Sequence, residues 1–300
     1  MTKKAWIHIL EWSVAAAAYV YLVYELATYE HYDLVAASLR AMGWREWAAL
    51  GLSVGLMPVN MGLEAWRWKT LVPMSFREAN RQVYYSKLAG LITPWRLGEY
   101  PARGVLMSEG AEEKSGGEIM KRVIAMGVVG SATMTMAIVI AGAVALGFSP
   151  TVVAQLGGSY LYALAGVVAV LGAALALAPA WLQKWFWGRE QERHTSSLIW
   201  RSLGQSIVRL GCWCVQLALV LYALGGLGSL GGPEIIGTCA IYYLLVTVTP
   251  NIPIVEAGVR GAWAMLLFGT PNAALAGVLL WVINTLLPCA IWPCWRTKTA

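Results

Sequence analysis

The chain of 300 residues is 58% hydrophobic and only 13% charged, with a formal net charge of +6 at pH 7 and a mean hydropathy of +0.59. This composition is typical of a polytopic helical membrane protein, and it leaves no room for a separate soluble catalytic domain. We therefore expect one all-α membrane domain over residues 1–300, and no role in binding nucleic acid.

Apolar segments of bilayer length recur along the chain. No cleavable signal is apparent, since Thr2-Lys3-Lys4 leads straight into a long apolar run that we interpret as a membrane helix. Six spans of about 20 residues, the length that crosses a bilayer, are predicted at Ala5–Ala27, Trp47–Leu71, Val123–Gly147, Ser159–Leu182, Ser202–Gly225 and Ala273–Trp295. Two further regions, Gln82–Met107 and Ile235–Phe268, are interrupted by Thr-Pro. Their halves are too short to cross singly, which predicts re-entrant hairpins or pairs of short helices.

Positive charge is distributed asymmetrically between the loops. With six crossings and two hairpins that return to their own side, fifteen Lys and Arg residues, Arg67 among them, fall in loops on one face and only Arg40 and Arg45 on the other. Because these residues gather on the cytoplasmic side, both termini are predicted to be cytoplasmic. Eight full crossings would give similar loop sides, so charge does not separate a hairpin from a crossing pair.

The two broken regions share one pattern, Thr-Pro followed by Glu-x-x-x-Arg-Gly. The first copy is Thr93, Pro94, Glu99, Arg103 and Gly104, and the second is Thr249, Pro250, Glu256, Arg260 and Gly261. The Glu, Arg and Gly of the two copies are each separated by 157 residues. We therefore predict two repeats, 1–150 and 151–300, each with three crossings and a Pro-broken hairpin (about 82–107 and 235–268). Three crossings are an odd number, so the repeats are inverted and their hairpin tips approach near the midplane.

A broken helix at membrane depth predicts a polar cavity, because an unwound backbone is tolerated only where it lines a cavity or is buried in protein. A half-helix beginning near Gly98 would also present free N–H groups to an anion. Each Glu lies four residues before its Arg, so the pair shares one helix face and could be purely structural.

Charge counting argues for an additional anion. Glu99 and Glu256 face five nearby cations, namely Lys87, Arg96, Arg103, Arg209 and Arg260. An unpaired Arg at the membrane centre costs about 2.5–3.5 kcal/mol, so the surplus cations either snorkel or hold an anion. Snorkelling is open to Lys87 and Arg209, whereas Arg96 at the tip is the first choice for contacting a phosphate. Glu11 and Glu64 are predicted to be solvated or to cap helix ends.

Sequence signals for catalysis are absent. There is no Gly-rich phosphate loop, no nucleophile elbow and no His or Cys cluster that could hold a metal, and the five cysteines lie within apolar runs. We therefore predict neither an enzyme nor a bound cofactor or metal. The alternative to this prediction is an intramembrane transferase that uses Glu99 or Glu256 as a general base.

The segment from Leu91 to Arg103, together with Pro250-Asn251-Ile252-Pro253 and Glu256, resembles the transmembrane family of lysylphosphatidylglycerol synthase, also called flippase-like membrane proteins. The second motif lacks the glycines expected between Pro253 and Glu256. The resemblance implies a bacterial or archaeal inner-membrane protein that moves or modifies lipids. Members that flip an aminoacylated phospholipid carry a soluble aminoacyl transferase domain, and this chain ends at Ala300, so we expect it not to synthesise lysyl lipid by itself.

The sequence thus predicts a lipid translocator that holds an anionic phospholipid or polyprenyl-phosphate-linked headgroup between the two hairpins. The alternative is a non-transporting membrane subunit that scaffolds a glycosyltransferase or a lipid synthase. The substrate-binding residues expected from the motifs are Thr93, Pro94, Arg96, Gly98, Glu99, Arg103, Pro250, Pro253, Glu256 and Arg260, with Lys87 and Arg209.

Overall fold

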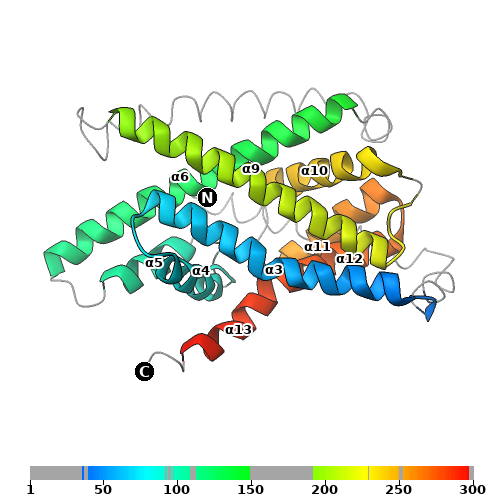
Figure 1. Ribbon diagram of the computed structural model, residues 1–300, viewed down its shortest axis with the longest axis horizontal. Coiled ribbons are helices and arrows are strands. Elements are labelled where there is room, and N and C mark those ends of the chain that lie inside the picture. Colours follow the sequence, from blue (N-terminus) through cyan, green and yellow to red (C-terminus); the bar gives the residue numbers. More distant parts are fainter. Residues whose placement is uncertain are drawn as a thin grey trace, which may run out of the picture.

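The computed structural model describes residues 36, 40–91, 93, 96, 98–108, 113–148, 192–228, 230–249 and 253–296. Every regular element within these residues is a helix (Figure 1). The elements are α3 (Trp44–Leu71), α4 (Phe76–Leu91), α5 (Glu99–Ser108), α6 (Glu113–Phe148), α9 (Glu192–Ala223), α10 (Gly232–Val248), α11 (Pro253–Phe268), α12 (Pro271–Trp281), the π-helix η4 (Val282–Leu286) and α13 (Leu287–Arg296).

Four of the described helical segments are long and apolar enough to cross a membrane. They are Trp44–Leu71, Gly116–Leu146, Ser197–Ala223 and Pro271–Ile291. These segments confirm four of the six predicted spans, and the all-α membrane class with them. The other two predicted spans, Ala5–Ala27 and Ser159–Leu182, lie outside the described residues.

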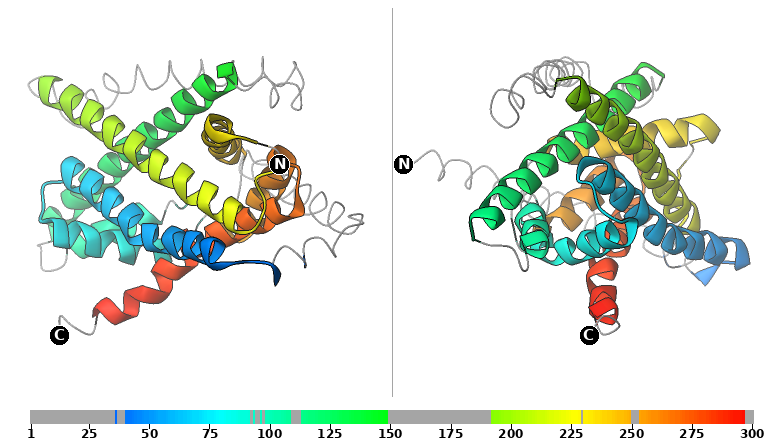
Figure 2. Two further views of the ribbon diagram at one scale, coloured as in Figure 1. Left: turned by 45° about the vertical axis from the view of Figure 1, so that its right-hand side comes forward. Right: turned by 60° about the vertical axis from the view of Figure 1, so that its left-hand side comes forward.

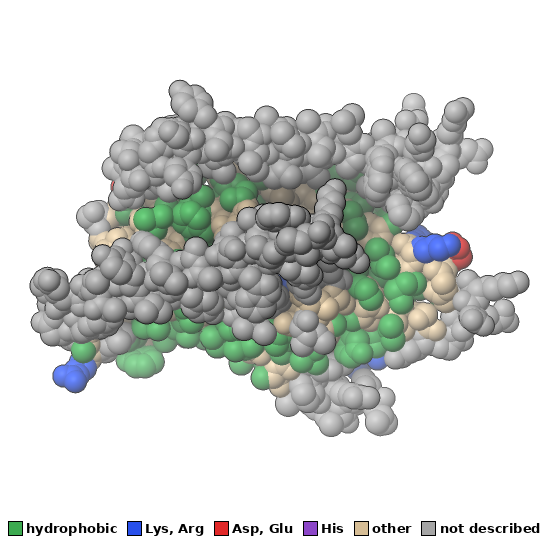
Figure 3. All heavy atoms as spheres, turned by 180° about the vertical axis from the view of Figure 1, so that it is seen from behind, with side chains coloured by type: hydrophobic (Ala, Val, Ile, Leu, Met, Phe, Trp, Pro, Cys, Tyr) green, Lys and Arg blue, Asp and Glu red, His purple; other side chains and the backbone are tan. Residues whose placement is uncertain are grey.

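The surface fits this assignment. Large apolar side chains are exposed along three of the long helices: Leu52, Val54 and Val59 on α3, Ile124, Val128, Ile140 and Val144 on α6, and Ile207, Val208 and Val215 on α9. Figure 3 shows hydrophobic side chains over much of the described surface on the rear face. Soluble monomers rarely expose contiguous apolar surface of this extent, whereas lipid-facing helices do.

The two predicted helix breaks are confirmed in position. Residues 92–98 separate α4 from α5, and residues 249–252 separate α10 from α11. The four helices have 16, 10, 17 and 16 residues, each shorter than the roughly 20 residues that a crossing requires. α4 and α10 start earlier than predicted, at Phe76 and Gly232. The mostly polar segment 77–81 extends α4, and Pro233 favours the first turn of α10.

A threonine ends the incoming helix of each pair in the same way. The hydroxyls of Thr93 and Thr249 each donate to the carbonyl four residues earlier, over 2.9 and 2.7 Å. Each hydroxyl also accepts a hydrogen bond from beyond the break, from the Gly98 N–H at 2.8 Å and from the Trp263 indole at 2.9 Å. The threonines therefore satisfy backbone groups that the break leaves open, and they tie the two short helices together.

Gly98 is required by the close approach at the first break. A Cβ on Gly98 would lie 2.7 Å from the Ala89 carbonyl oxygen and 2.8 Å from the Thr93 hydroxyl. We expect Gly98→Ala to lower the free energy of unfolding in detergent by about 1–3 kcal/mol, because the added methyl displaces these contacts. Gly55→Ala is the matched control, since nothing lies within 4 Å of a Cβ there and alanine favours a helix interior. Equal unfolding midpoints for the two variants would contradict this account of the break.

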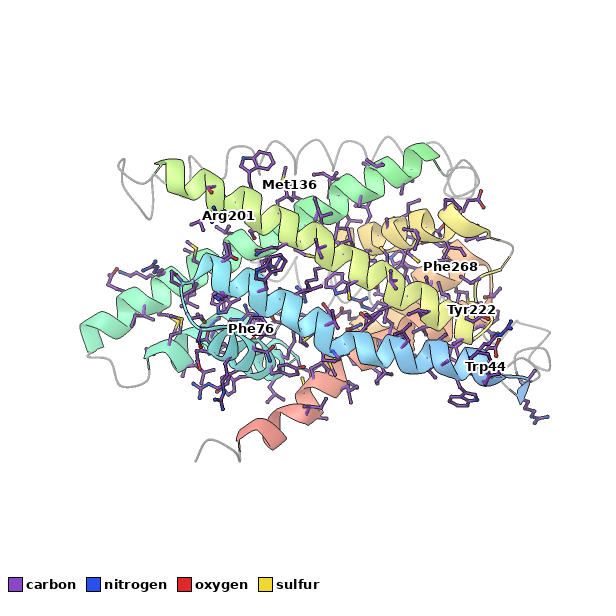
Figure 4. All side chains as sticks on the ribbon, viewed as in Figure 1. Trp44, Phe76, Met136, Arg201, Tyr222 and Phe268 are labelled. Carbon is purple, nitrogen blue, oxygen red and sulfur yellow. The ribbon has the colours of Figure 1, made fainter. Side chains whose placement is uncertain are left out.

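The long helices α3 and α9 pack against each other, and the pairs of short helices, α4–α5 and α10–α11, lie beside them (Figures 1 and 2). Ser53 and Gln216 join α3 to α9 through two reciprocal side-chain to backbone bonds of 3.3 and 2.9 Å. α6 packs against α5 and α10, α12 packs against α11, and α13 packs against α4. α13 projects away from the other helices (Figure 2), and Trp44 lies at the outer end of α3 (Figure 4).

Candidate functional site

Glu64 on α3 is the centre of a buried charged cluster. Its carboxylate lies 2.5 Å from Arg67 of the same helix, 2.5 Å from Arg209 on α9 and 3.2 Å from Arg103 on α5. Glu64 is 5% exposed and Arg103 only 1%. One carboxylate therefore binds three guanidinium groups and links three helices that are far apart in the sequence.

Glu99 extends this cluster toward α4. The Lys87 ammonium lies 2.8 Å from one carboxylate oxygen of Glu99, and Arg103 lies 3.3 Å from the other. Gly90 makes room for this arrangement, because a Cβ at that position would lie 2.6 Å from Cγ of Glu99. The Glu99–Arg103 pair confirms the expected contact between residues four apart, and Lys87 adds a closer partner.

Glu256 joins the two breaks. Arg96, from the first break, donates to Oε2 of Glu256 at 2.8 Å, and Arg260 donates twice to Oε1 at 2.9 and 2.8 Å. Arg96 also donates to the Thr285 hydroxyl of η4 at 2.9 Å. The tip of the first broken region therefore contacts the second broken region and the π-helix.

The backbone of Arg96 is itself unusual, since its φ of +57° makes it the one non-glycine residue with positive φ in the described part of the chain. Such a conformation costs about 1–3 kcal/mol and persists only where surrounding contacts hold it. The ion pair with Glu256 and the bond to Thr285 are those contacts. π-Helices are also concentrated at functional sites, and here η4 supplies Thr285.

The cluster around Glu64 and Glu99 and the second cluster around Glu256 together carry an excess of positive charge. Six cations (Arg67, Lys87, Arg96, Arg103, Arg209 and Arg260) face three carboxylates (Glu64, Glu99 and Glu256), which leaves +3 among the described residues. Seven of these nine side chains belong to buried residues. A buried charge is costly unless it is paired, so the excess favours binding of an anion.

A partly open cavity lies between the two clusters. Its walls come from α3, α4, the first break, α9, α10, α11, α12 and η4, and its lining residues are Asn60, Met61, Lys87, Arg96, Arg209, Trp213, Tyr243, Arg260, Leu280, Trp281, Asn284 and Thr285. Four cationic side chains line this cavity, and no described carboxylate does. We call it the cationic cavity.

The structure brings together most of the residues expected from the motifs. The cationic cavity is lined by Lys87, Arg96, Arg209 and Arg260. Glu256 binds Arg96 and Arg260, and Glu99 binds Lys87 and Arg103. Arg103 also binds Glu64. Lys87 and Arg209 are each 6% exposed, so they pair with Glu99 and Glu64 and do not snorkel.

The remaining predicted site residues belong to the breaks. Thr93 and Gly98 bond to each other across the first break and do not line the cavity. Pro253 begins α11. Pro94 and Pro250 lie outside the described residues, so their predicted role stays a prediction.

The expectation for Glu64 was wrong, and Arg67 was wrongly counted among the loop cations. Both are buried, at 5% and 6% exposure, because α4, α6 and α9 pack against α3. A polar stripe could have revealed them, since Ser53, Asn60, Glu64 and Arg67 recur at helical spacing within an apolar span.

The comparison with models of protein families found no match to this chain, and the comparison with curated proteins found none either.

Proposed function

We propose that this chain is a lipid translocator that holds an anionic headgroup in the cationic cavity. The observation that carries the proposal is the lining of that cavity by Lys87, Arg96, Arg209 and Arg260 with no described carboxylate among them. The candidate membrane helices α3, α9 and α12 contribute to its wall. A cationic cavity among membrane helices suits the phosphate of a phospholipid or of a polyprenyl-phosphate-linked lipid.

The packing supports two inverted repeats. If α3, α4, α5 and α6 correspond to α9, α10, α11 and the helix from α12 to α13, then corresponding helices make corresponding contacts. α3 packs against its counterpart α9. The contact of α4 with α13 corresponds to that of α10 with α6, and the contact of α5 with α6 corresponds to that of α11 with α12. The short helices then form two re-entrant hairpins whose tips meet at the Arg96–Glu256 pair. Transporters built from inverted repeats bind substrate at such broken helices.

The motif from Leu91 to Arg103 supports placing the chain beside the flippase-like transmembrane family of lysylphosphatidylglycerol synthase. That placement, and the excess of Lys and Arg on one set of loops, support a location in a bacterial or archaeal cytoplasmic membrane with both termini in the cytoplasm.

A non-transporting scaffold for a glycosyltransferase or lipid synthase is the competing function. It is favoured by one observation: all three buried carboxylates already form ion pairs, so the clusters could serve only to hold the helices together. This function predicts that the cavity-lining cations matter for stability and not for lipid movement.

Lys87→Met tests the translocator against the scaffold. Glu99 keeps Arg103 at 3.3 Å in this variant, so the protein should fold, while the cavity loses one cation. We expect at least about a tenfold loss of translocation of acyl-labelled phosphatidic acid in proteoliposomes, since a charged hydrogen bond contributes about 1.5–3 kcal/mol. Lys121→Met is the matched control, because Lys121 forms an exposed pair with Glu118. Unchanged translocation by the folded Lys87→Met protein would reject the proposed site.

A further inference from the structure

The charged groups that line the cationic cavity are all hydrogen-bond donors. Lys87, Arg96, Arg209 and Arg260 carry N–H groups only. Trp281 also lines the cavity, and its indole nitrogen is buried without a hydrogen-bond partner in the described part of the chain. A buried donor without a partner is costly, so the site is incomplete without an acceptor.

The side-chain oxygens of Asn60, Asn284 and Thr285 in the cavity wall already accept hydrogen bonds, while the Tyr243 hydroxyl donates to the Trp213 carbonyl at 3.1 Å. Oδ1 of Asn60 accepts from Arg209 Nε at 2.9 Å and from Trp213 Nε1 at 2.8 Å. Oδ1 of Asn284 accepts from the Asn60 amide at 2.8 Å, and the Thr285 hydroxyl accepts from Arg96 at 2.9 Å. A ligand rich in donors, such as an ammonium group, would therefore compete for oxygens that already bind the protein.

The arginines retain donors for a ligand. Arg96 makes both of its bonds through Nη2, so Nε and Nη1 form none with the described residues. Arg209 uses Nε and Nη1, and its Nη2 forms no hydrogen bond within the described residues. A guanidinium group carries five N–H donors in a planar fork that matches phosphate oxygens.

We infer that the headgroup is an acceptor-only polyanion, a phosphate monoester or diphosphate, in preference to a phosphodiester or a headgroup with an ammonium group. The inference rests on the proposed function and adds the charge and chemistry of its substrate. A phosphate monoester carries a charge of about −1.5 to −2 at pH 7, which offsets more of the +3 excess than the single charge of a phosphodiester. An aminoacylated lipid would bring a further cation next to the four that line the cavity.

The test compares headgroups on matched acyl chains. Purified protein in detergent is titrated with dioleoyl phosphatidic acid (a monoester), phosphatidylglycerol (an anionic diester), phosphatidylethanolamine and soluble inorganic pyrophosphate, and the unfolding midpoint is measured. We expect phosphatidic acid to bind at least about tenfold more tightly than phosphatidylglycerol, and phosphatidylethanolamine to give no shift. Pyrophosphate should give a smaller shift than phosphatidic acid, because it lacks the chains.

Trp281→Phe connects this preference to the cavity. The variant removes the indole N–H and keeps an aromatic ring, and we expect it to weaken binding of phosphatidic acid about threefold to tenfold, the net value of one hydrogen bond. Binding of phosphatidylglycerol as tight as that of phosphatidic acid would overturn the polyanion inference and leave the translocator proposal intact. If none of the lipids shifts the unfolding midpoint, the translocator proposal is rejected. If pyrophosphate alone shifts it, the ligand is a soluble phosphate and not a lipid headgroup.

Discussion

Replacing Glu64 by Gln is expected to lower the free energy of unfolding by about 3–5 kcal/mol, the cost of breaking a buried ion pair by removing one partner. Glutamine keeps the shape of the side chain and removes its charge. Arg67, Arg103 and Arg209 would then lie at 6%, 1% and 6% exposure without the carboxylate that binds all three. Equilibrium unfolding in detergent measures the effect.

Glu78→Gln is the matched control for this prediction. Glu78 pairs with Arg81 at 3.0 Å, also three residues apart on one helix, but both side chains are 35% exposed. Exposed pairs of this kind contribute about 0–1 kcal/mol. If Glu64→Gln and Glu78→Gln unfold with the same free energy, Glu64 is not the centre of a buried cluster.

Replacing Arg96 by Ala is expected to abolish most lipid translocation while leaving the protein folded. Glu256 keeps both bonds from Arg260, at 2.9 and 2.8 Å, so it does not become an unpaired buried carboxylate. The cavity, however, loses the cation at the point where the two broken regions meet. Truncating a charged group that binds its partner in a buried site costs about 2–5 kcal/mol, so the rate should fall by about 30-fold or more.

The measurement is translocation of acyl-labelled phosphatidic acid in proteoliposomes, with the unfolding midpoint of each protein determined in parallel. Lys121→Ala serves as the exposed control, since its side chain and that of its partner Glu118 are 69% and 76% exposed. Wild-type translocation by Arg96→Ala would remove Arg96 from the headgroup site. A large loss of stability in Arg96→Ala would instead assign the Arg96–Glu256 pair a structural role.

Hydropathy and local chemistry were sufficient to predict the helices that the structure describes. A bilayer imposes a length and an apolar composition on each span, so α3, α6, α9 and the helix from α12 to α13 were visible as apolar runs. The breaks were equally visible, because Thr93-Pro94 and Thr249-Pro250 interrupt two further apolar runs. The pairing of Glu256 with Arg260 followed from their spacing of four residues.

Contacts between distant segments could not be predicted in this way. Arg96 and Glu256 are 160 residues apart, and no local pattern specifies that they bind each other. No sequence pattern predicted the π-helical turn that supplies Thr285 to Arg96. Glu64 was misassigned for a related reason: a charge near the end of an apolar span looks solvated until the packing of other helices over it is known.

Mass spectrometry of the lipids retained through purification directly tests whether the cationic cavity is a headgroup site. Wild-type protein, Arg96→Ala and Lys121→Ala are purified in the same detergent, and their bound lipids are compared. A headgroup site at the cationic cavity predicts that wild type and Lys121→Ala are enriched in one class of phosphate-bearing anionic lipid, and that Arg96→Ala loses it. The same bulk membrane lipids in all three proteins would contradict the site and direct the search toward protein partners.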